Sequence, residues 1–453
     1  MESRTHPNRP LPYMPQSATI NAKEQGSRQP ARALMEPATS DRLGGQLAGL
    51  DPNDPQFATA AVDRMLAAAR EATASDLHLQ PSTAGLELKF RIDGVLQPIA
   101  VFPVELTANL IARLKVKADL LTYQTDRPQE GRIRLRESNG EVRISTFPTL
   151  HGERAVVRLF GRHEQFERLA DLGLHDDVCC TLRRLLTETS GAILVCGPAG
   201  SGKTTTVYAA LREIAAESAG RRSLVSIEDP VEVAVDGVAQ SQVNDQVGLD
   251  LGTGLRFLMR QDPEVIMVGE VRDRPTAEAA LGASLTGHLL LSTFHAGSAA
   301  ETIGRLLDMG IEPYVARSGL LAILCQRLVR RLCTCARTTD ADDARLGLPV
   351  ERVAVPVGCD ECGGTGYRGR LLLVEMLTPG RTELGRAILS RCDTARLEQL
   401  AVESGMVTRW QRACRAVEQG RTSPAEVRRV LGFSAAGGPM PKTEDTARED
   451  TDR

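Results

Sequence analysis

The sequence Ala-Ile-Leu-Val-Cys-Gly-Pro-Ala-Gly-Ser-Gly-Lys-Thr occupies residues 192–204 and decides the fold of the chain. Residues 192–196 form a continuous apolar run, which is typical of a strand buried on both faces. The next eight residues match the pattern GxxxxGK[ST] in full, and a helical pattern follows from Thr205 to Ala216. A strand, a glycine-rich loop and a helix in this order predict a phosphate-binding loop in an α/β domain.

The residues of this loop have predicted roles in holding a nucleotide. Glycines let backbone N–H groups surround a phosphate, and the N-terminus of the following helix adds partial positive charge. Lys203 is expected to reach the β- and γ-phosphates, and the Thr204 hydroxyl is expected to ligate Mg²⁺. The predicted nucleotide-binding residues are Gly197, Pro198, Ala199, Gly200, Ser201, Gly202, Lys203, Thr204 and Thr205.

Two acidic segments follow apolar runs farther along the chain. Ser226–Glu232 contains the carboxylates of Glu228, Asp229 and Glu232, and Val265–Glu270 consists of four apolar residues, a glycine and a glutamate. The second segment has the form of a Walker B strand with glycine in place of the usual aspartate. Glu270 is therefore expected to polarise the attacking water, and Glu228 to lie on the metal or water side. Either carboxylate alone could instead cap a strand end.

Histidines flank a third apolar run, Leu289–Phe294. His288 precedes it and His295 follows it. Because ligands bind at the carboxyl ends of strands in such sheets, His295 could sense the γ-phosphate, although a purely structural role is the alternative. The predicted catalytic residues are Glu270, Lys203, Glu228 and His295.

The remaining sequence suggests four segments. Residues 1–50 are a proline-rich arm and residues 434–453 an acid-rich tail, and both are expected to be disordered. Residues 51–169 alternate short strands with two helical patterns, which predicts a small α+β domain. Residues 170–433 alternate buried strands with helices, which predicts an α/β fold with a mainly parallel sheet.

Composition excludes several classes of protein. The net charge of −3 and an aromatic content of 3% argue against direct nucleic-acid binding. No apolar run approaches the roughly 18 residues that a membrane span needs. Among the 55 basic residues only six are lysines, and Lys203 is the only lysine between residues 118 and 441. A chain that otherwise uses arginine for positive charge thus keeps one lysine in the phosphate loop, where a compact ammonium is needed.

The motor motifs together resemble the ATPases of type II secretion and type IV pilus assembly. The resemblance rests on residues 197–204, Ser226–Glu232, Leu255–Glu264, Glu270–Asp273 and Thr286–His295. It continues in Ala74–Leu79, Phe90–Val95 and Arg143–Arg154 of the first domain and in Gly366–Arg370 and Val417–Leu431 near the end, covering roughly residues 55–433.

This resemblance implies a RecA-like motor domain in a ring-shaped homohexamer that hydrolyses ATP with Mg²⁺. It implies assembly of pilin or pseudopilin subunits through a platform protein of the inner membrane, with the ATPase peripheral to the cytoplasmic face of that membrane. Arginines at matching positions are expected to contact phosphate, in the case of Arg143 and Arg158, or to make intersubunit or core contacts, in the case of Arg260 and Arg272.

Four of the ten cysteines form two close pairs, Cys333-Thr-Cys335 and Cys359-Asp-Glu-Cys362, separated by 23 residues. Such pairs beside glycine turns resemble a structural Zn²⁺ site of four thiolates. Assembly members of the family carry one and retraction members generally do not, which favours assembly. The first pair, however, is C-x-C rather than C-x-x-C. The other six cysteines lie in apolar patterns and are expected in the core: Cys179, Cys180, Cys196, Cys325, Cys392 and Cys414.

Three alternatives remain open at this point. A DNA-uptake motor or a retraction ATPase would belong to the same superfamily, and the first would be stimulated by DNA. A nucleotide-dependent regulatory module would carry the same motifs with little turnover.

Overall fold

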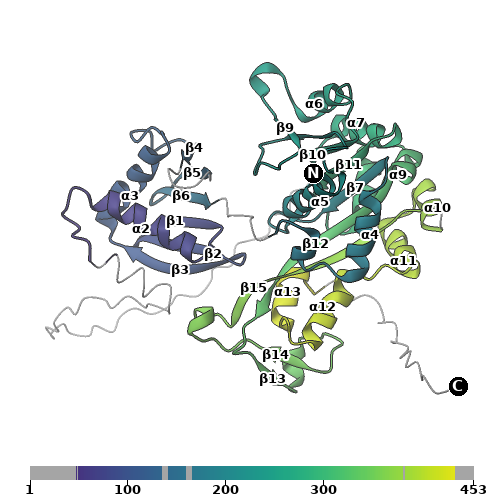
Figure 1. Ribbon diagram of the computed structural model, residues 1–453. Helices are drawn as coiled ribbons and strands as arrows, with labels where there is room; N and C mark the ends of the chain where they lie inside the picture. Colours follow the sequence, from purple (N-terminus) through teal and green to yellow (C-terminus); the bar gives the residue numbers. More distant parts are fainter. Residues whose placement is uncertain (1–46, 48, 135–140, 160–165, 381–382, 434–453) are drawn as a thin grey trace, which may run out of the picture. The chain divides into compact units, whose positions relative to one another are not determined.

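The computed structural model describes residues 47, 49–134, 141–159, 166–380 and 383–433 (Figure 1). Residues 1–46 and 48 of the predicted arm, and the whole of the predicted tail at 434–453, lie outside the described residues. Disorder in both segments therefore stays a prediction. None of the described helices combines the length and the apolar character that a membrane span requires.

The N-terminal part of the described chain is a six-stranded antiparallel sheet with two helices. The strand order is β3-β2-β1-β6-β5-β4. One apolar cluster joins the inward-facing residues of the strands to the buried stripes of both helices. The elements are α2 (Phe57–Glu71), β1 (Asp76–Ser82), β2 (Gly85–Ile92), β3 (Val95–Phe102), α3 (Val104–Lys117), β4 (Gln129–Arg134), β5 (Glu141–Thr149) and β6 (Gly152–Leu159).

The larger part contains a seven-stranded sheet of order β15-β12-β7-β11-β10-β8-β9, in which every pairing is parallel except that of β12 with β15. Its strands are β7 (Gly191–Cys196), β8 (Leu224–Glu228), β9 (Ala239–Gln242), β10 (Val265–Val271), β11 (Leu289–Phe294), β12 (Leu320–Leu332) and β15 (Tyr367–Leu377). The predicted α/β class with a mainly parallel sheet is confirmed.

Helices cover both faces of this sheet. Side chains alternate along β7, so that Ala192, Leu194 and Cys196 join one apolar cluster and Ile193 and Val195 join the other. Helices α4 (Asp176–Leu186) and α5 (Lys203–Ser218) pack on the second face. The first face carries α6 (Leu251–Leu258), α7 (Arg274–Leu285), α8 (Ala299–Asp308), α9 (Pro313–Gly319), α10 (Glu383–Leu389) and α11 (Thr394–Glu403). The strands are buried on both sides, as their unbroken apolar runs predicted.

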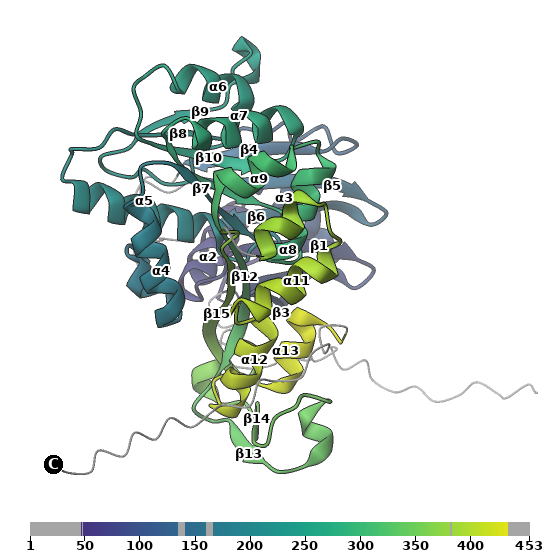
Figure 2. The ribbon, with the colours of Figure 1, turned by 90° about the vertical axis from the view of Figure 1, so that its right-hand side faces the viewer.

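Strands β12 and β15 form a long antiparallel ribbon at one edge of the sheet (Figure 2). Helices α12 (Arg409–Glu418) and α13 (Pro424–Leu431) pack against it. The chain between the two strands forms a small hairpin of β13 (Arg337–Thr339) and β14 (Val353–Val355), followed by a 3₁₀ turn at Asp360–Cys362. All four predicted zinc ligands lie in this excursion.

Several element bounds differ from the sequence-based expectation. Helix α5 begins at Lys203 rather than Thr205, since Gly202 in the left-handed region already directs the chain into the first turn. Helix α3 ends at Lys117 where the helical pattern suggested Leu121, and β4 spans Gln129–Arg134 where the strand pattern suggested a start at Gly131. The antiparallel edge strand β15 was not anticipated, because an apolar run does not show the direction in which its strand runs.

Candidate functional site

A loop of residues 197–202 connects the C-terminal end of β7 to α5. Glycine is required at position 197, because a Cβ atom there would lie 2.5 Å from the Oγ of Ser201 and 2.7 Å from the carbonyl oxygen of Gln326. Gly202 has a φ of 88°, which favours glycine, directly before the helix begins. The local sequence therefore dictates both the tight approach to β12 and the entry into α5.

The side chain of Lys203 folds back over this loop. Its ammonium donates to the carbonyl oxygens of Gly197 at 3.0 Å and Pro198 at 3.1 Å. Burial lowers the pKa of Lys203, and the carboxylate of Glu270 acts in the opposite direction. Thr204 and Thr205 lie half-buried in the first turn of α5. The nine predicted binding residues thus lie in this loop and in the first turn of α5, and their contact with a nucleotide stays a prediction.

Glu270 lies near the C-terminal end of β10 and is held from two sides. Its Oε1 is 2.7 Å from Nε2 of His295, and its Oε2 is 2.7 Å from Nε of Arg272. Only 14% of the Glu270 side chain is exposed. Arg272 also lies 3.8 Å from Asp229. The predicted catalytic residues Glu270 and His295 are therefore direct neighbours, and Arg272 joins them.

The imidazole of His295 is set up to be neutral near pH 7. Partial burial, followed by the charge of Lys203, lowers the pKa of His295. A neutral ring can donate its Nε2 hydrogen to the Glu270 carboxylate while that group keeps its charge. Beside the pair lies a cavity of about 240 Å³, lined by Glu270, Val271, Arg272, Phe294, His295, Arg305 and Met309.

Glycine at position 269, where a Walker B strand usually has aspartate, has a packing reason. A Cβ atom at Gly269 would lie 3.3 Å from the Cα of Glu228 on β8. The strand also bulges here, because the pairing of β10 with β11 shifts between Val268 and Glu270. The close approach of β8 leaves little room for a side chain at residue 269, and Glu270, just after the bulge, supplies the carboxylate at this end of the strand.

Glu228 is almost completely buried, with 2% exposed, and hydrogen bonds surround it. Tyr208 donates its hydroxyl to Oε2, while Ser226 at 2.6 Å and Gln240 at 3.1 Å donate to Oε1. Both the burial and the bond to Glu228 raise the pKa of Tyr208. These three donors satisfy both oxygens of the Glu228 carboxylate within the protein. A metal-side or water-side role for Glu228 stays a prediction.

The predicted arginines fall in different places. Arg143 on β5 and Arg158 on β6 are directly opposite partners in the six-stranded sheet. Arg158 is 63% exposed, and its Nε lies 3.0 Å from Asp76. Arg260 is exposed just after α6. Of the four, Arg272 is the one that contacts a predicted catalytic residue within the motor part of the chain, and phosphate contact by Arg143 and Arg158 stays a prediction.

The four cysteines of the two pairs come together despite the C-x-C spacing of the first pair. Their sulfur atoms all lie within 4.8 Å of one another. The Sγ–Sγ distances are 3.8 Å for Cys333–Cys359, 3.9 Å for Cys335–Cys362 and 3.7 Å for Cys359–Cys362. A tetrahedron with metal–sulfur bonds of about 2.3 Å has edges of about 3.8 Å. The cluster therefore has the size of a Zn²⁺ site.

The other cysteines match the core prediction in part. Cys179, Cys196, Cys325 and Cys414 are buried. Cys180 is exposed, so the core prediction is wrong for it, because the neighbouring Cys179 already occupies the buried stripe of α4. Cys392 is partly buried and packs against the core.

Sequence reasoning missed several polar residues around the site. Arg305 of α8 donates to the carbonyl oxygen of His295, and Arg327 of β12 donates to that of Gly297. Tyr208 and Gln240 were also missed as partners of Glu228. No spacing in the sequence links these residues to the motifs, since each contact depends on how strands and helices are arranged in space.

This site joins a phosphate-binding loop to a glutamate and a histidine on the neighbouring parallel strands, which defines a nucleotide-binding motor domain of the P-loop class. A family model described as "Type II/IV secretion system protein" matches residues 51–429. The chain belongs to this family.

Curated relatives agree with this assignment. A putative type II secretion system protein E of Escherichia coli K12 is 42% identical over 380 residues, which cover 82% of this chain and 76% of that protein. The type IV pilus assembly ATPase TfpB of Acinetobacter baylyi is 38% identical over 394 residues, 84% of this chain and 66% of that protein. At the level of the family, the predicted secretion and pilus motor class is confirmed over the DNA-uptake and regulatory alternatives.

Solved structures agree on the fold. The ATPase DotB of Legionella pneumophila has a TM-score of 0.60 at 23% identity and covers 85% of this chain and 98% of its own. The pilus retraction motor PilT with bound ADP has a TM-score of 0.54 at 26% identity, covering 83% of this chain and 96% of its own.

Proposed function

We propose that this protein is a Mg²⁺-dependent ATPase that powers the assembly of pilin or pseudopilin subunits in a type II secretion or type IV pilus system. The observation that carries the proposal is the contact of Glu270 with His295 at 2.7 Å, at the strand ends next to a complete phosphate-binding loop. Relatives named for type II secretion and for pilus assembly support the choice of system.

In this proposal the residues divide the work of phosphoryl transfer. The backbone amides of residues 197–205 hold the phosphates, and Lys203 leaves its loop carbonyls to place its ammonium between the β- and γ-phosphates. Glu270 orients the attacking water, and Arg272 and neutral His295 hold its carboxylate at a defined angle. The Thr204 hydroxyl, in the first turn of α5, would hold Mg²⁺, which when bound neutralises charge on the phosphate oxygens.

Zn²⁺ binding by Cys333, Cys335, Cys359 and Cys362 belongs to the same proposal. Three of the sulfur separations, at 3.7–3.9 Å, match a tetrahedral four-thiolate site, and all four sulfurs lie within 4.8 Å of one another. Backbone N–H groups of Cys359 and Gly366 donate to the Cys362 sulfur at 3.1 Å, which stabilises a thiolate there. The role is structural, and its presence favours the assembly type over retraction.

The proposal extends to the assembly in which the motor works. It acts as a homohexamer at the cytoplasmic face of the inner membrane, where it engages a platform protein, and it makes no direct contact with nucleic acid. In such a ring Arg143 and Arg158 contact phosphate. The domain boundaries near residues 51, 170 and 433 are part of the proposal.

Steady-state turnover of the purified chain tests the proposal. Wild type should hydrolyse ATP only with Mg²⁺, and Lys203→Ala should abolish turnover. Lys203→Arg keeps the charge but should also lose most turnover, because a planar guanidinium cannot replace a compact ammonium between two phosphates. ATP turnover that is untouched in Lys203→Ala would refute the function.

A further inference from the structure

The turn that carries His295 is tied by Arg327, which none of the motifs includes, to strand β12 beside the phosphate-binding loop. The amide of Gly197 also donates directly to the carbonyl oxygen of Phe294 at 3.3 Å. Strand β12 runs parallel to β7, and the last paired residues are Cys325 and Cys196. Residues 326 and 327 therefore continue beside the start of the phosphate loop. The position of Gly197 directly against the Gln326 carbonyl confirms this close packing.

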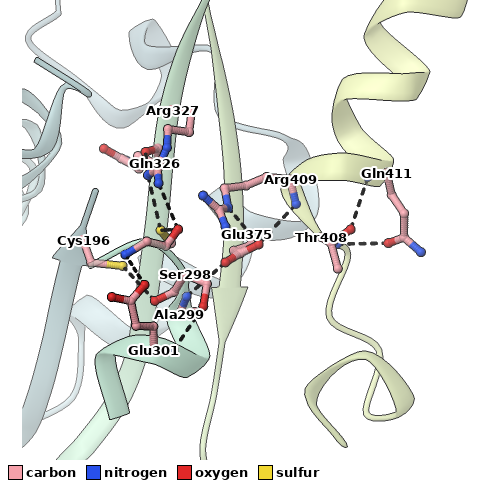
Figure 3. A network of polar contacts seen from close by, with 12 residues as sticks. Cys196, Ser298, Ala299, Glu301, Gln326, Arg327, Glu375, Thr408, Arg409 and Gln411 are labelled. Carbon is pink, nitrogen blue, oxygen red and sulfur yellow. Dashed lines mark hydrogen bonds and ion pairs between the residues drawn. The ribbon is translucent and has the colours of Figure 1, made fainter. Parts of the chain in front are cut away.

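The guanidinium of Arg327 joins two separate pieces of backbone (Figure 3). Its Nη1 donates to the carbonyl oxygen of Gln326 at 2.9 Å, and its Nη2 donates to that of Gly297 at 2.9 Å. Gly297 is two residues after His295, in the turn between β11 and α8. A planar fork with two donors in a fixed relation suits this geometry, whereas the donors of a lysine ammonium rotate freely at the end of a flexible stem.

Further contacts complete the attachment of the same turn. The Cys325 thiol lies 3.6 Å from the Gly297 carbonyl. The Cys196 thiol lies 3.9 Å from the Ser298 carbonyl (Figure 3). The Gly297 amide donates to Glu301 at 2.6 Å, and a Cβ atom at Gly297 would collide with that carboxylate. The thiols are weak donors, so Arg327 provides the strong link between the turn and β12.

The positive charge of Arg327 is not neutralised by a carboxylate among its bonded partners in the described part of the chain. It is half-buried, and within the described ranges its partners are carbonyl oxygens and one thiol, with no carboxylate. The pKa of Lys203 is lowered mainly by burial, and the charge of Arg327 adds to this effect. Two cations, Lys203 and Arg327, therefore lie near the phosphate-binding loop, and the bonded partners of Arg327 among the described residues include no carboxylate.

We propose that Arg327 is a positioning residue that ties the turn at residues 295–298 to β12 where that strand packs against the phosphate-binding loop, so that an occupied loop fixes His295 against Glu270. The inference rests on the proposed function and adds to it a residue that couples binding to hydrolysis. Arg327 acts through the backbone of Gly297 and not by contact with the nucleotide.

Amide hydrogen exchange of the full chain tests the coupling without turnover. With Mg²⁺ and an ATP analogue that has an imido group between the β- and γ-phosphates, wild type should show slower exchange in both 198–206 and 297–301. Arg327→Ala should bind the analogue within about threefold of wild type and protect 198–206, but lose at least tenfold of the protection at 297–301. Arg327→Lys should be intermediate. The control Arg331→Ala, an exposed position on the same strand, should match wild type.

Turnover gives a second readout. Arg327→Ala should lower kcat at least tenfold and leave KM within threefold of wild type. In a His295→Ala background the same change should lower kcat less than twofold, because both substitutions remove the positioning of His295 against Glu270.

Each outcome has a distinct meaning. If wild type binds no analogue, the proposed function fails. If wild type binds it but 297–301 is protected equally in Arg327→Ala, or is not protected in wild type, the positioning role fails. A loss of analogue affinity of tenfold or more would make Arg327 a phosphate ligand and overturn the proposal. Additive losses with His295→Ala would also overturn it.

Discussion

The Nε2 atom of His295 lies 2.7 Å from Oε1 of Glu270, and this contact joins the ends of two neighbouring parallel strands. Strand β10 delivers the glutamate and β11 the histidine. Because parallel strands bring their carboxyl ends to the same edge of a sheet, the two side chains meet next to the phosphate-binding loop that follows β7. In the proposed function, this contact holds Glu270 in place as the base beside the phosphate-binding loop.

Glu270→Gln should remove the carboxylate and keep its shape. We expect kcat to fall by about 10²–10⁴, the range for loss of a general base, while nucleotide affinity stays within about threefold. Turnover and binding of a fluorescent ADP would be measured side by side. Glu278→Gln is the control, since that exposed glutamate pairs with Arg274 on α7 and should retain wild-type kcat. Equal losses in both variants would argue against a catalytic role for Glu270.

The pH dependence of kcat should report on His295. Because the pKa of His295 is lowered from its ordinary value of 6.5, the ring is neutral above that pH and becomes charged only below it. A charged ring would pair with Glu270 and weaken it as a base, so kcat should fall on the acid side below about pH 6.5. In His295→Asn this acid limb should move to lower pH. An unchanged limb would assign it to another group.

The same shift has a consequence for stability. The unfolded chain binds a proton at His295 more readily than the folded chain does. The contribution of His295 to stability is therefore fully present above about pH 6.5 and is lost as the pH falls through the folded-state pKa.

Tyr208→Phe should show how far Glu228 depends on its donors. The change leaves a buried carboxylate oxygen without the Tyr208 hydroxyl, which we expect to cost about 1–3 kcal/mol of stability. Thermal and denaturant unfolding would measure the loss. Tyr123→Phe, at a side chain with 76% exposure, serves as the control and should cost almost nothing. If the two substitutions lowered the free energy of unfolding equally little, the hydrogen bond from Tyr208 to Glu228 would not contribute to stability.

Two lysines of α3 allow a comparison of buried and exposed ion pairs. Lys115 is fully buried and its ammonium lies 2.8 Å from the Glu153 carboxylate and 2.7 Å from the Gln124 carbonyl. Lys115→Met should cost about 3–5 kcal/mol, because Glu153 is left buried without a partner. The double variant with Glu153→Leu should recover much of this loss.

Lys117→Met is the matched control on the same helix. Lys117 pairs with Asp63, whose side chain is 53% exposed, so its loss should cost at most about 1 kcal/mol. Denaturant midpoints of the three variants would decide the matter. The prediction fails if Lys115→Met is no more destabilising than Lys117→Met.

Cys335→Ser should release Zn²⁺ from the four-cysteine cluster. We expect wild type to contain about one zinc per chain and the variant well under one, because three thiolates and a hydroxyl hold the metal less tightly. Metal analysis by mass spectrometry after desalting would give the ratio. Cys180→Ser, at an exposed thiol outside the cluster, should keep its zinc. Wild type with no bound metal would refute the site.

Local motifs made much of this site predictable. Residues 197–204 are consecutive, and their glycines, lysine and threonine dictate a loop and helix start that need little from the rest of the chain. The apolar runs before Glu270 and His295 predicted that both lie at the ends of strands, and parallel pairing then placed them at one edge. The lysine count also pointed to Lys203, but it gave no sign that Lys115 is buried in an ion pair, because burial depends on what packs over the helix.

The sequence by itself therefore determined the class of fold, the phosphate loop and the identity of the residues at the strand ends, since each depends on the order of neighbouring residues. The tertiary structure alone decided which groups meet. It enclosed Glu228 with Tyr208 and Gln240, and it brought four sulfurs to within 4.8 Å despite the short first spacing. It also joined Arg327 to Gly297. Such contacts link elements far apart in the chain, and their geometry exists only once the strands have paired and the helices have packed.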